Sequence, residues 1–124
     1  MSKSSTELCA SLRRLRLQRS LLLRRLMCVE ELAIGSVSVV ARKCGKPNCR
    51  CVQGGGHNQT LFLFRGEDGR RHCKLIRQAD SKRLLSAGDR YREFRAGLRE
   101  LRAINEREQQ ILEALMEGQA LHYE

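Results

Sequence analysis

The stretch CGKPNCRC, residues 44–51, places three cysteines within eight positions at a C-x4-C-x-C spacing. Cysteine thiolates are preferred ligands of zinc, which takes four nitrogen or sulfur ligands in a tetrahedral arrangement. Gly45, Pro47 and Asn48 favour a sharp turn, which would let two nearby thiolates reach one ion. The stretch therefore predicts a zinc knuckle that supplies three of the four ligands of a Zn²⁺ ion. These ligands are Cys44, Cys49 and Cys51.

Two residues are candidates for the fourth zinc ligand. His57 follows the glycine run of residues 54–56 and would complete a site of three cysteines and one histidine. Cys73 lies on a predicted strand and would give an all-cysteine site, whereas its neighbour His72 would point to the opposite face of that strand. A site closed by four protein ligands is structural rather than catalytic.

The cysteines also admit other interpretations. A redox switch is one alternative for the cluster. A catalytic cysteine would need a base and an orienting residue, and the chain has only three histidines and no recognisable set of this kind, so we do not expect an enzyme. Outside the cluster, Cys9, Cys28 and Cys73 are interpreted as small buried hydrophobic residues, with Cys73 also the alternative metal ligand.

The cellular compartment follows from what the sequence lacks. No apolar run approaches the roughly 20 residues that a transmembrane helix needs, and residues 1–26 show neither a sustained apolar stretch nor a small-residue cleavage site. We therefore expect a cytoplasmic protein, where reduced thiols favour metal binding over disulfides. The Ser-, Arg- and Leu-rich start is also typical of a mitochondrial transit peptide, an alternative that the composition leaves open.

The charge of the chain indicates the class of partner. The formal net charge is +10, and most of it comes from residues 34–79, which contain nine basic residues and only two acidic ones. Basic side chains around a rigid knuckle are typical of proteins that hold a phosphate backbone. We expect nucleic acid, DNA or RNA, as the partner, ahead of an anionic membrane surface or an acidic protein. The residues expected to contact phosphates are Lys43, Lys46, Arg50, Arg70 and Arg71.

A long N-terminal helix is predicted over residues 4–34. Ser4 and Glu7 match a capping box, in which the serine caps the helix start and the glutamate follows three residues later. Apolar residues then recur at alternating steps of four and three, with Arg19 in the one polar slot of this heptad seam. The seam consists of Leu8, Leu12, Leu15, Leu22, Leu26, Val29 and Ala33.

A second long helix is predicted over residues 80–117, followed by a tail over residues 118–124. Its seam has the same period and is interrupted by two polar residues, Asn105 and Glu108, which Ile104 and Ile111 flank. The apolar members of this seam are Leu84, Ala87, Tyr91, Phe94, Leu98, Leu101, Leu112 and Leu115.

Between the helices, residues 35–79 predict a three-stranded antiparallel meander that carries the knuckle. The stretches GSVSVVARK, TLFLFR and RRHCKLI have β-branched and aromatic content, and GEDGR between the last two is a hairpin turn signal. The sequence therefore predicts one α+β domain over residues 1–124. Because a small sheet cannot cover two long seams, we expect the helices to pair as an antiparallel coiled-coil hairpin, with homodimerisation through any seam left exposed.

The central segment resembles a family of short uncharacterised prokaryotic proteins, a domain of unknown function. The family pattern reads G-S, then C-G-K-P-x-C-x-C, a glycine-containing loop, and H-G-P-Y. The resemblance spans residues 35 to 110 and includes YREF at residues 91–94 and the pair Ile104–Asn105. After the histidine this chain departs from the pattern, with Asn58, Gln59 and Thr60 in place of G-P-Y. The matched knuckle positions are Gly35, Ser36, Cys44, Gly45, Lys46, Pro47, Cys49, Cys51 and His57.

The resemblance implies two expectations. It favours His57 over Cys73 as the fourth zinc ligand, because the family pattern places a histidine there. It also implies occurrence near mobile elements, which agrees with DNA or RNA as the partner. We therefore expect a non-enzymatic, zinc-knuckle accessory protein that binds nucleic acid through phosphate contacts. The alternative is a coiled-coil adaptor for protein interactions in which the zinc site is purely structural.

Overall fold

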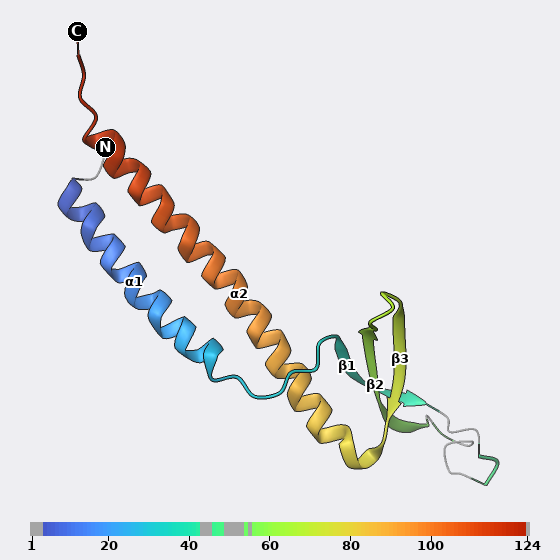
Figure 1. The fold of residues 1–124 in the computed structure, drawn as a ribbon. Helices are drawn as coiled ribbons and strands as arrows, with labels where there is room; N and C mark the ends of the chain where they lie inside the picture. The colour runs from blue at the N-terminus through green and yellow to red at the C-terminus, as the bar shows by residue number, and fades with distance from the viewer. Residues whose placement is uncertain (1–3, 43–45, 49–53, 55, 124) are drawn as a thin grey trace. The chain divides into compact units, whose positions relative to one another are not determined.

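The computed structural model describes residues 4–42, 46–48, 54 and 56–123, which form two helices and a three-stranded antiparallel sheet (Figure 1). The predicted α+β class and element order are confirmed. Contacts divide the chain into two compact units. The helix-pair unit comprises Met1–Val29 and Phe94–Glu124, and the sheet unit comprises Glu30–Glu93. The elements are α1 (Ser5–Met27), β1 (Ser36–Arg42), β2 (His57–Arg65), β3 (Arg71–Ile76) and α2 (Gln78–Gly118), so α2 contributes to both units.

Helix α1 starts where the sequence predicts but is shorter than expected. The backbone N–H of Glu7 donates a hydrogen bond to Ser4 Oγ at 3.2 Å, which is the expected serine cap. The helix ends at Met27, not at residue 34. The following segment leaves the helix because its polar groups find partners in the sheet unit. Ala33 N–H donates to the carbonyl of Ala87 at 3.1 Å.

In the helix-pair unit, α1 and α2 run antiparallel and pack together, as predicted (Figure 1). The buried core consists of Leu15, Leu22 and Ile104. The buried stripe on α2 keeps the predicted Leu101, but Leu98, Asn105 and Leu112 are replaced by the residues one position earlier. Ile104 is 6% exposed and Ile111 packs against the core, whereas Leu98 and Leu112 are 44% and 53% exposed. Gly97 also belongs to this stripe, and a Cβ built there would lie 2.7 Å from Leu26 Cδ2.

The polar interruptions of the two predicted seams meet in the helix-pair unit. Arg19 donates from Nε and Nη2 to Asn105 Oδ1 at 3.1 and 2.7 Å. Its Nη2 also lies 2.9 Å from Glu108 Oε2, and the Glu108 side chain is only 13% exposed. A polar contact of this kind satisfies only one alignment of the two helices, so it supports a single register.

Replacing Arg19 by alanine should destabilise the helix pair. The change leaves the largely buried carboxylate of Glu108 without its cation, and we expect a loss of about 1–3 kcal/mol in the free energy of unfolding. Urea denaturation followed by circular dichroism measures this loss. The matched control is Arg16→Ala on an exposed position of α1, which should change stability by less than about 0.5 kcal/mol. Equal effects of the two changes would contradict the assignment.

In the sheet unit the strand order is β1-β2-β3. The helix-covered face carries Val37, Thr60 and Phe62; Val37 is buried with Ala33 and Ala87, and Phe62 packs against them. The hydroxyls of Thr60 and Ser81 are hydrogen-bonded. Successive side chains of a strand point to opposite faces of the sheet, so the residues between those of the helix-covered face lie on the other face, here called the open face. Its residues include Leu61, Leu63, Arg65, Arg71, Cys73 and Leu75.

The stretch GEDGR, residues 66–70, forms the turn between β2 and β3. Gly69 N–H donates to the carbonyl of Gly66 at 3.0 Å, and Gly66 N–H donates to the carbonyl of Arg70 at 2.9 Å. Gly69 has a φ of 77°, a conformation that favours glycine. This is a type I turn followed by a left-handed residue, a common three-residue hairpin connection. It fixes the pairing of Arg65 with Arg71.

Candidate functional site

The three cysteines predicted to bind zinc, Cys44, Cys49 and Cys51, lie outside the described residues. Of the knuckle, the structure describes Lys46, Pro47 and Asn48, which are exposed, with a turn at the last two. Within the described ranges, no three His, Cys, Asp or Glu side chains lie together in a way that could hold a metal ion.

The candidate fourth ligands lie at opposite ends of the sheet. His57 is the first residue of β2 and pairs with Arg42, the last residue of β1, so the cysteine segment begins and ends beside His57. Cys73 pairs with Leu63, six positions further along β2. At about 3.3 Å per strand residue, that separation is roughly 20 Å. One zinc ion with ligand bonds of about 2.0–2.3 Å cannot contact both residues.

Two cysteines outside the cluster differ from their predicted burial. Cys28 and Cys73 are exposed, and Cys9 is half-buried. The prediction of buried residues is wrong for Cys28 because α1 ends beside it, and its N–H caps the helix by donating to the carbonyl of Arg25 at 3.3 Å. It is wrong for Cys73 because this residue lies on the open face, which no described helix covers.

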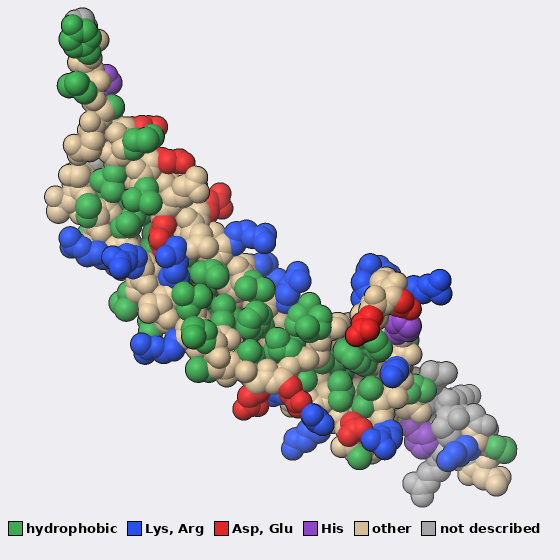
Figure 2. All heavy atoms as spheres, in the orientation of Figure 1, with side chains coloured by type: hydrophobic (Ala, Val, Ile, Leu, Met, Phe, Trp, Pro, Cys, Tyr) green, Lys and Arg blue, Asp and Glu red, His purple; other side chains and the backbone are tan. Residues whose placement is uncertain are grey.

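Of the residues predicted to contact phosphates, Lys43 and Arg50 lie outside the described residues, and Lys46 is exposed. Arg70 and Arg71 are exposed at the end of the β2–β3 turn. Figure 2 shows basic side chains at this turn, next to acidic and histidine side chains. The structure thus brings two of the predicted contacts together on one hairpin.

The acidic residue of this turn is engaged in holding the hairpin. Asp68 Oδ1 accepts hydrogen bonds from the backbone N–H of Arg70 at 2.9 Å and pairs with His72 Nε2 at 3.1 Å. The hydrogen bond from the Arg70 backbone lowers the pKa of the Asp68 carboxyl most, and the bond with the His72 side chain lowers it further. The ring of His72 also stacks on Phe64, with 5.5 Å between ring centroids. Asp68 therefore rigidifies the turn and makes no ion pair with either arginine side chain.

Arginines in and next to the first part of α2 have acidic partners. Arg83 donates to both carboxylate oxygens of Glu31 at 2.7 and 2.8 Å, which lowers the pKa of Glu31. Arg77 pairs with Asp80 at 3.2 Å. In contrast, no carboxylate in the described part of the chain lies within ion-pair distance of the hairpin arginines. These are Arg65, Arg70 and Arg71.

Sequence reasoning missed Arg65. This residue is exposed and lies directly opposite Arg71 on the open face. The sequence contained the signal for this pair, because Arg65 directly precedes the GEDGR turn and Arg71 directly follows it, so a hairpin places them opposite each other. The paired arginines extend the predicted phosphate contacts from one strand to two.

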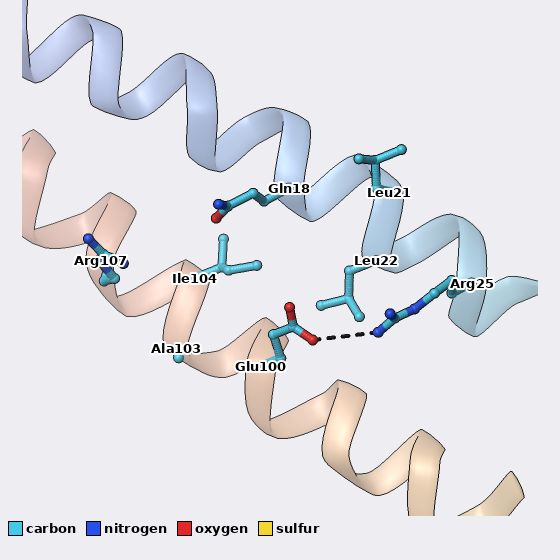
Figure 3. Close-up of a pocket in the computed structure, with 8 residues that line it drawn as sticks. All are labelled: Gln18, Leu21, Leu22, Arg25, Glu100, Ala103, Ile104 and Arg107. Atoms are coloured by element: carbon cyan, nitrogen blue, oxygen red, sulfur yellow. Dashed lines mark ion pairs between the residues drawn. The ribbon is translucent and has the colours of Figure 1, made fainter.

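The helix-pair unit has shallow grooves along the line where its helices meet. Figure 3 shows one of them, where Gln18, Leu22 and Ile104 lie between the helices, and Arg25 reaches across to Glu100 at 3.5 Å. Aliphatic side chains and one exposed ion pair form most of this lining. The groove therefore presents a surface for contact along the helices.

The described helices include none that is both long enough and apolar enough to span a membrane. The family described as Domain of unknown function (DUF6788) matches residues 10–86, a range that begins in α1 and ends in the first part of α2. No curated protein and no solved structure matches the chain. The family match covers more than half of the sequence and agrees with the predicted membership of an uncharacterised family. The chain therefore belongs to the DUF6788 family.

Proposed function

We propose that this protein binds nucleic acid, DNA or RNA, through phosphate contacts made by its sheet unit, in a non-enzymatic accessory role. The observation that carries the proposal is the unbalanced positive charge of the β2–β3 hairpin. Its arginines have no acidic partner among the described residues, whereas Arg77 and Arg83 nearby do. Unpaired, exposed arginines are suited to bidentate contacts with phosphate oxygens.

A zinc ion held by Cys44, Cys49, Cys51 and His57 is the second part of the proposal. The donor set of three thiolates and one imidazole suits Zn²⁺ in a structural site. The strand register supports His57, because Cys44 follows Arg42 by only two residues and the chain can carry it no more than about 7 Å from that residue. Cys73 is too far away along the sheet to share an ion with Cys44. The zinc would fix the segment that carries Lys43, Lys46 and Arg50.

The salt dependence of binding tests the proposed function. If the five predicted residues each neutralise one phosphate, the log–log slope of affinity against salt should be near −4.5 on duplex DNA. Affinity should then fall about 500-fold between 50 and 200 mM salt. Fluorescence anisotropy with a labelled duplex and a labelled single strand measures the slope. Because the chain has no tryptophan, the ratio of absorbance at 260 and 280 nm after low-salt purification provides a second readout.

The alternative function is an adaptor that binds a partner helix or a second copy through the helix-pair unit. It is supported by large apolar side chains that remain exposed there, which Figure 2 shows as a band along the unit. Leu17, Leu21 and Met116 are 63%, 54% and 66% exposed. Absence of nucleic-acid binding at low salt would contradict the proposed function and favour this alternative.

A further inference from the structure

We infer that Arg65 and Arg71 form a two-arginine clamp for a single phosphate group on the open face of the sheet unit. The inference rests on the proposed function for the source of that phosphate, a phosphodiester of the nucleic-acid backbone. It adds Arg65 to the binding surface and assigns the contact to one face of the sheet.

The pairing geometry brings the two side chains close together. Gly66 N–H donates to the carbonyl of Arg70, which makes these two residues a hydrogen-bonded pair. Pairs alternate along an antiparallel ladder, so the next pair, Arg65 with Arg71, is a non-hydrogen-bonded pair. In such pairs the Cβ atoms are about 4.5–5.5 Å apart, and the side chains leave the sheet on the same face. Two guanidinium groups on these stems can reach the oxygens of one phosphate.

The electrostatics of the pair favour a bound anion. Like charges directly opposite each other destabilise an antiparallel pair, so the two arginines weaken the hairpin when no counter-charge is present. The nearby carboxylate of Asp68 already accepts bonds from Arg70 N–H and His72. Neither Asp68 nor Glu67 makes an ion pair with either arginine in the structure as described. A phosphate between the guanidiniums would replace the repulsion with charge-assisted hydrogen bonds.

The position of the pair gives the binding surface two ends. Arg65 is the last residue of β2 and His57 is the first, so about 26 Å of strand separates them at 3.3 Å per residue. That distance exceeds the size of one phosphate group, so a phosphate held by the clamp is not shared with residues near His57. Changes at the two places should therefore add in their effect on binding.

The experiment compares Arg65→Gln and Arg71→Gln with Lys74→Gln in the full zinc-loaded chain. Lys74 is the matched control because it is exposed on β3, loses the same charge and lies on the opposite face from Arg71. Each arginine change should weaken duplex binding about 3- to 10-fold at 50 mM salt. Changing both arginines should reduce the salt slope by about 0.9, because the pair neutralises one phosphate. The Lys74 change should weaken binding less than about 2-fold.

A second measurement uses no nucleic acid. In low-salt buffer, Arg65→Gln should raise the unfolding temperature because it removes the repulsion, and Lys74→Gln should not. Inorganic phosphate, compared with chloride at equal ionic strength, should stabilise the wild-type chain more than Arg65→Gln.

The outcomes separate the clamp from the proposed function. If the wild-type chain binds nucleic acid but Arg65→Gln behaves like Lys74→Gln in both measurements, the clamp is overturned and the proposed function stands. If the wild-type chain binds no nucleic acid while phosphate still stabilises it selectively, the clamp stands as a phosphate site and the proposed function falls. If neither response is seen, both are overturned.

Discussion

Replacing Gly35 by alanine is expected to unfold the sheet unit or to destabilise it by about 3 kcal/mol or more. Gly35 precedes β1 and has a φ of 155°, which residues with a Cβ rarely adopt. A Cβ there would lie 2.2 Å from the carbonyl oxygen of Leu63 and 3.1 Å from Phe62 Cε2. The Leu63 oxygen belongs to the backbone of β2, the central strand, so it cannot move away without disturbing the sheet.

Two other glycines provide graded controls for this prediction. Gly69→Ala changes a residue with a φ of 77° whose Cβ would meet no other atom within 4 Å, so only the backbone strain of about 1–2 kcal/mol applies. Gly118→Ala, at the end of α2, meets no atom and has no such strain. Urea denaturation should rank the losses as Gly35 above Gly69 above Gly118. A Gly35→Ala protein as stable as the Gly118→Ala protein would show that the contact with β2 is absent in solution.

Much of the fold was predictable because its local signals agree with its packing. The serine cap at Ser4, the β-branched strands and the GEDGR turn each specify an element through contacts within a few residues. The polar interruptions of the two seams, Arg19 in the first helix and Asn105 and Glu108 in the second, were visible in the sequence, but no contact between them was predicted. Each polar residue interrupts the apolar seam of its own helix, and together they form one hydrogen-bonded contact between the two helices.

The errors arose where a distant contact decides the local structure. No glycine or proline marks the end of α1 at Met27. The helix ends because Glu31 and Ala33 bond to residues of α2 that lie far away in sequence. On α2, the stripes containing Leu98 and Ile104 have the same heptad period, so periodicity cannot choose between them. The missing side chain of Gly97, beside Leu26, favours the second stripe.

The same limit applies to the candidate zinc site. In the sequence, His57 and Cys73 are both reasonable fourth ligands, since each lies within a short stretch of chain from the cysteines. The strand register separates them, because it pairs Cys73 with Leu63 and places His57 opposite Arg42. Register depends on which residues of two strands face each other, and that information comes from the assembled sheet rather than from either strand.

Replacing His57 by alanine should therefore remove most of the bound zinc, whereas Cys73→Ser should leave it in place. Purified wild-type protein is expected to contain about one zinc per chain. Loss of an outer-shell partner weakens metal affinity 10- to 100-fold, so loss of a direct ligand should weaken it by at least about 100-fold. Because zinc binding contributes folding energy, removal of the metal by a chelator should also lower the unfolding temperature of the wild-type chain.

Elemental analysis after dialysis against a competing chelator measures the occupancy of each variant. The matched control for His57→Ala is His122→Ala, which changes an exposed histidine beyond the end of α2 and should retain zinc. If Cys73→Ser loses zinc while His57→Ala retains it, the ligand set is wrong, because an ion bound at Cys73 would be about 20 Å from the end of the sheet where Cys44 joins it. If all three variants retain zinc, neither His57 nor Cys73 is the fourth ligand. Loss of zinc from His57→Ala alone would support His57, the first residue of β2, as the fourth zinc ligand.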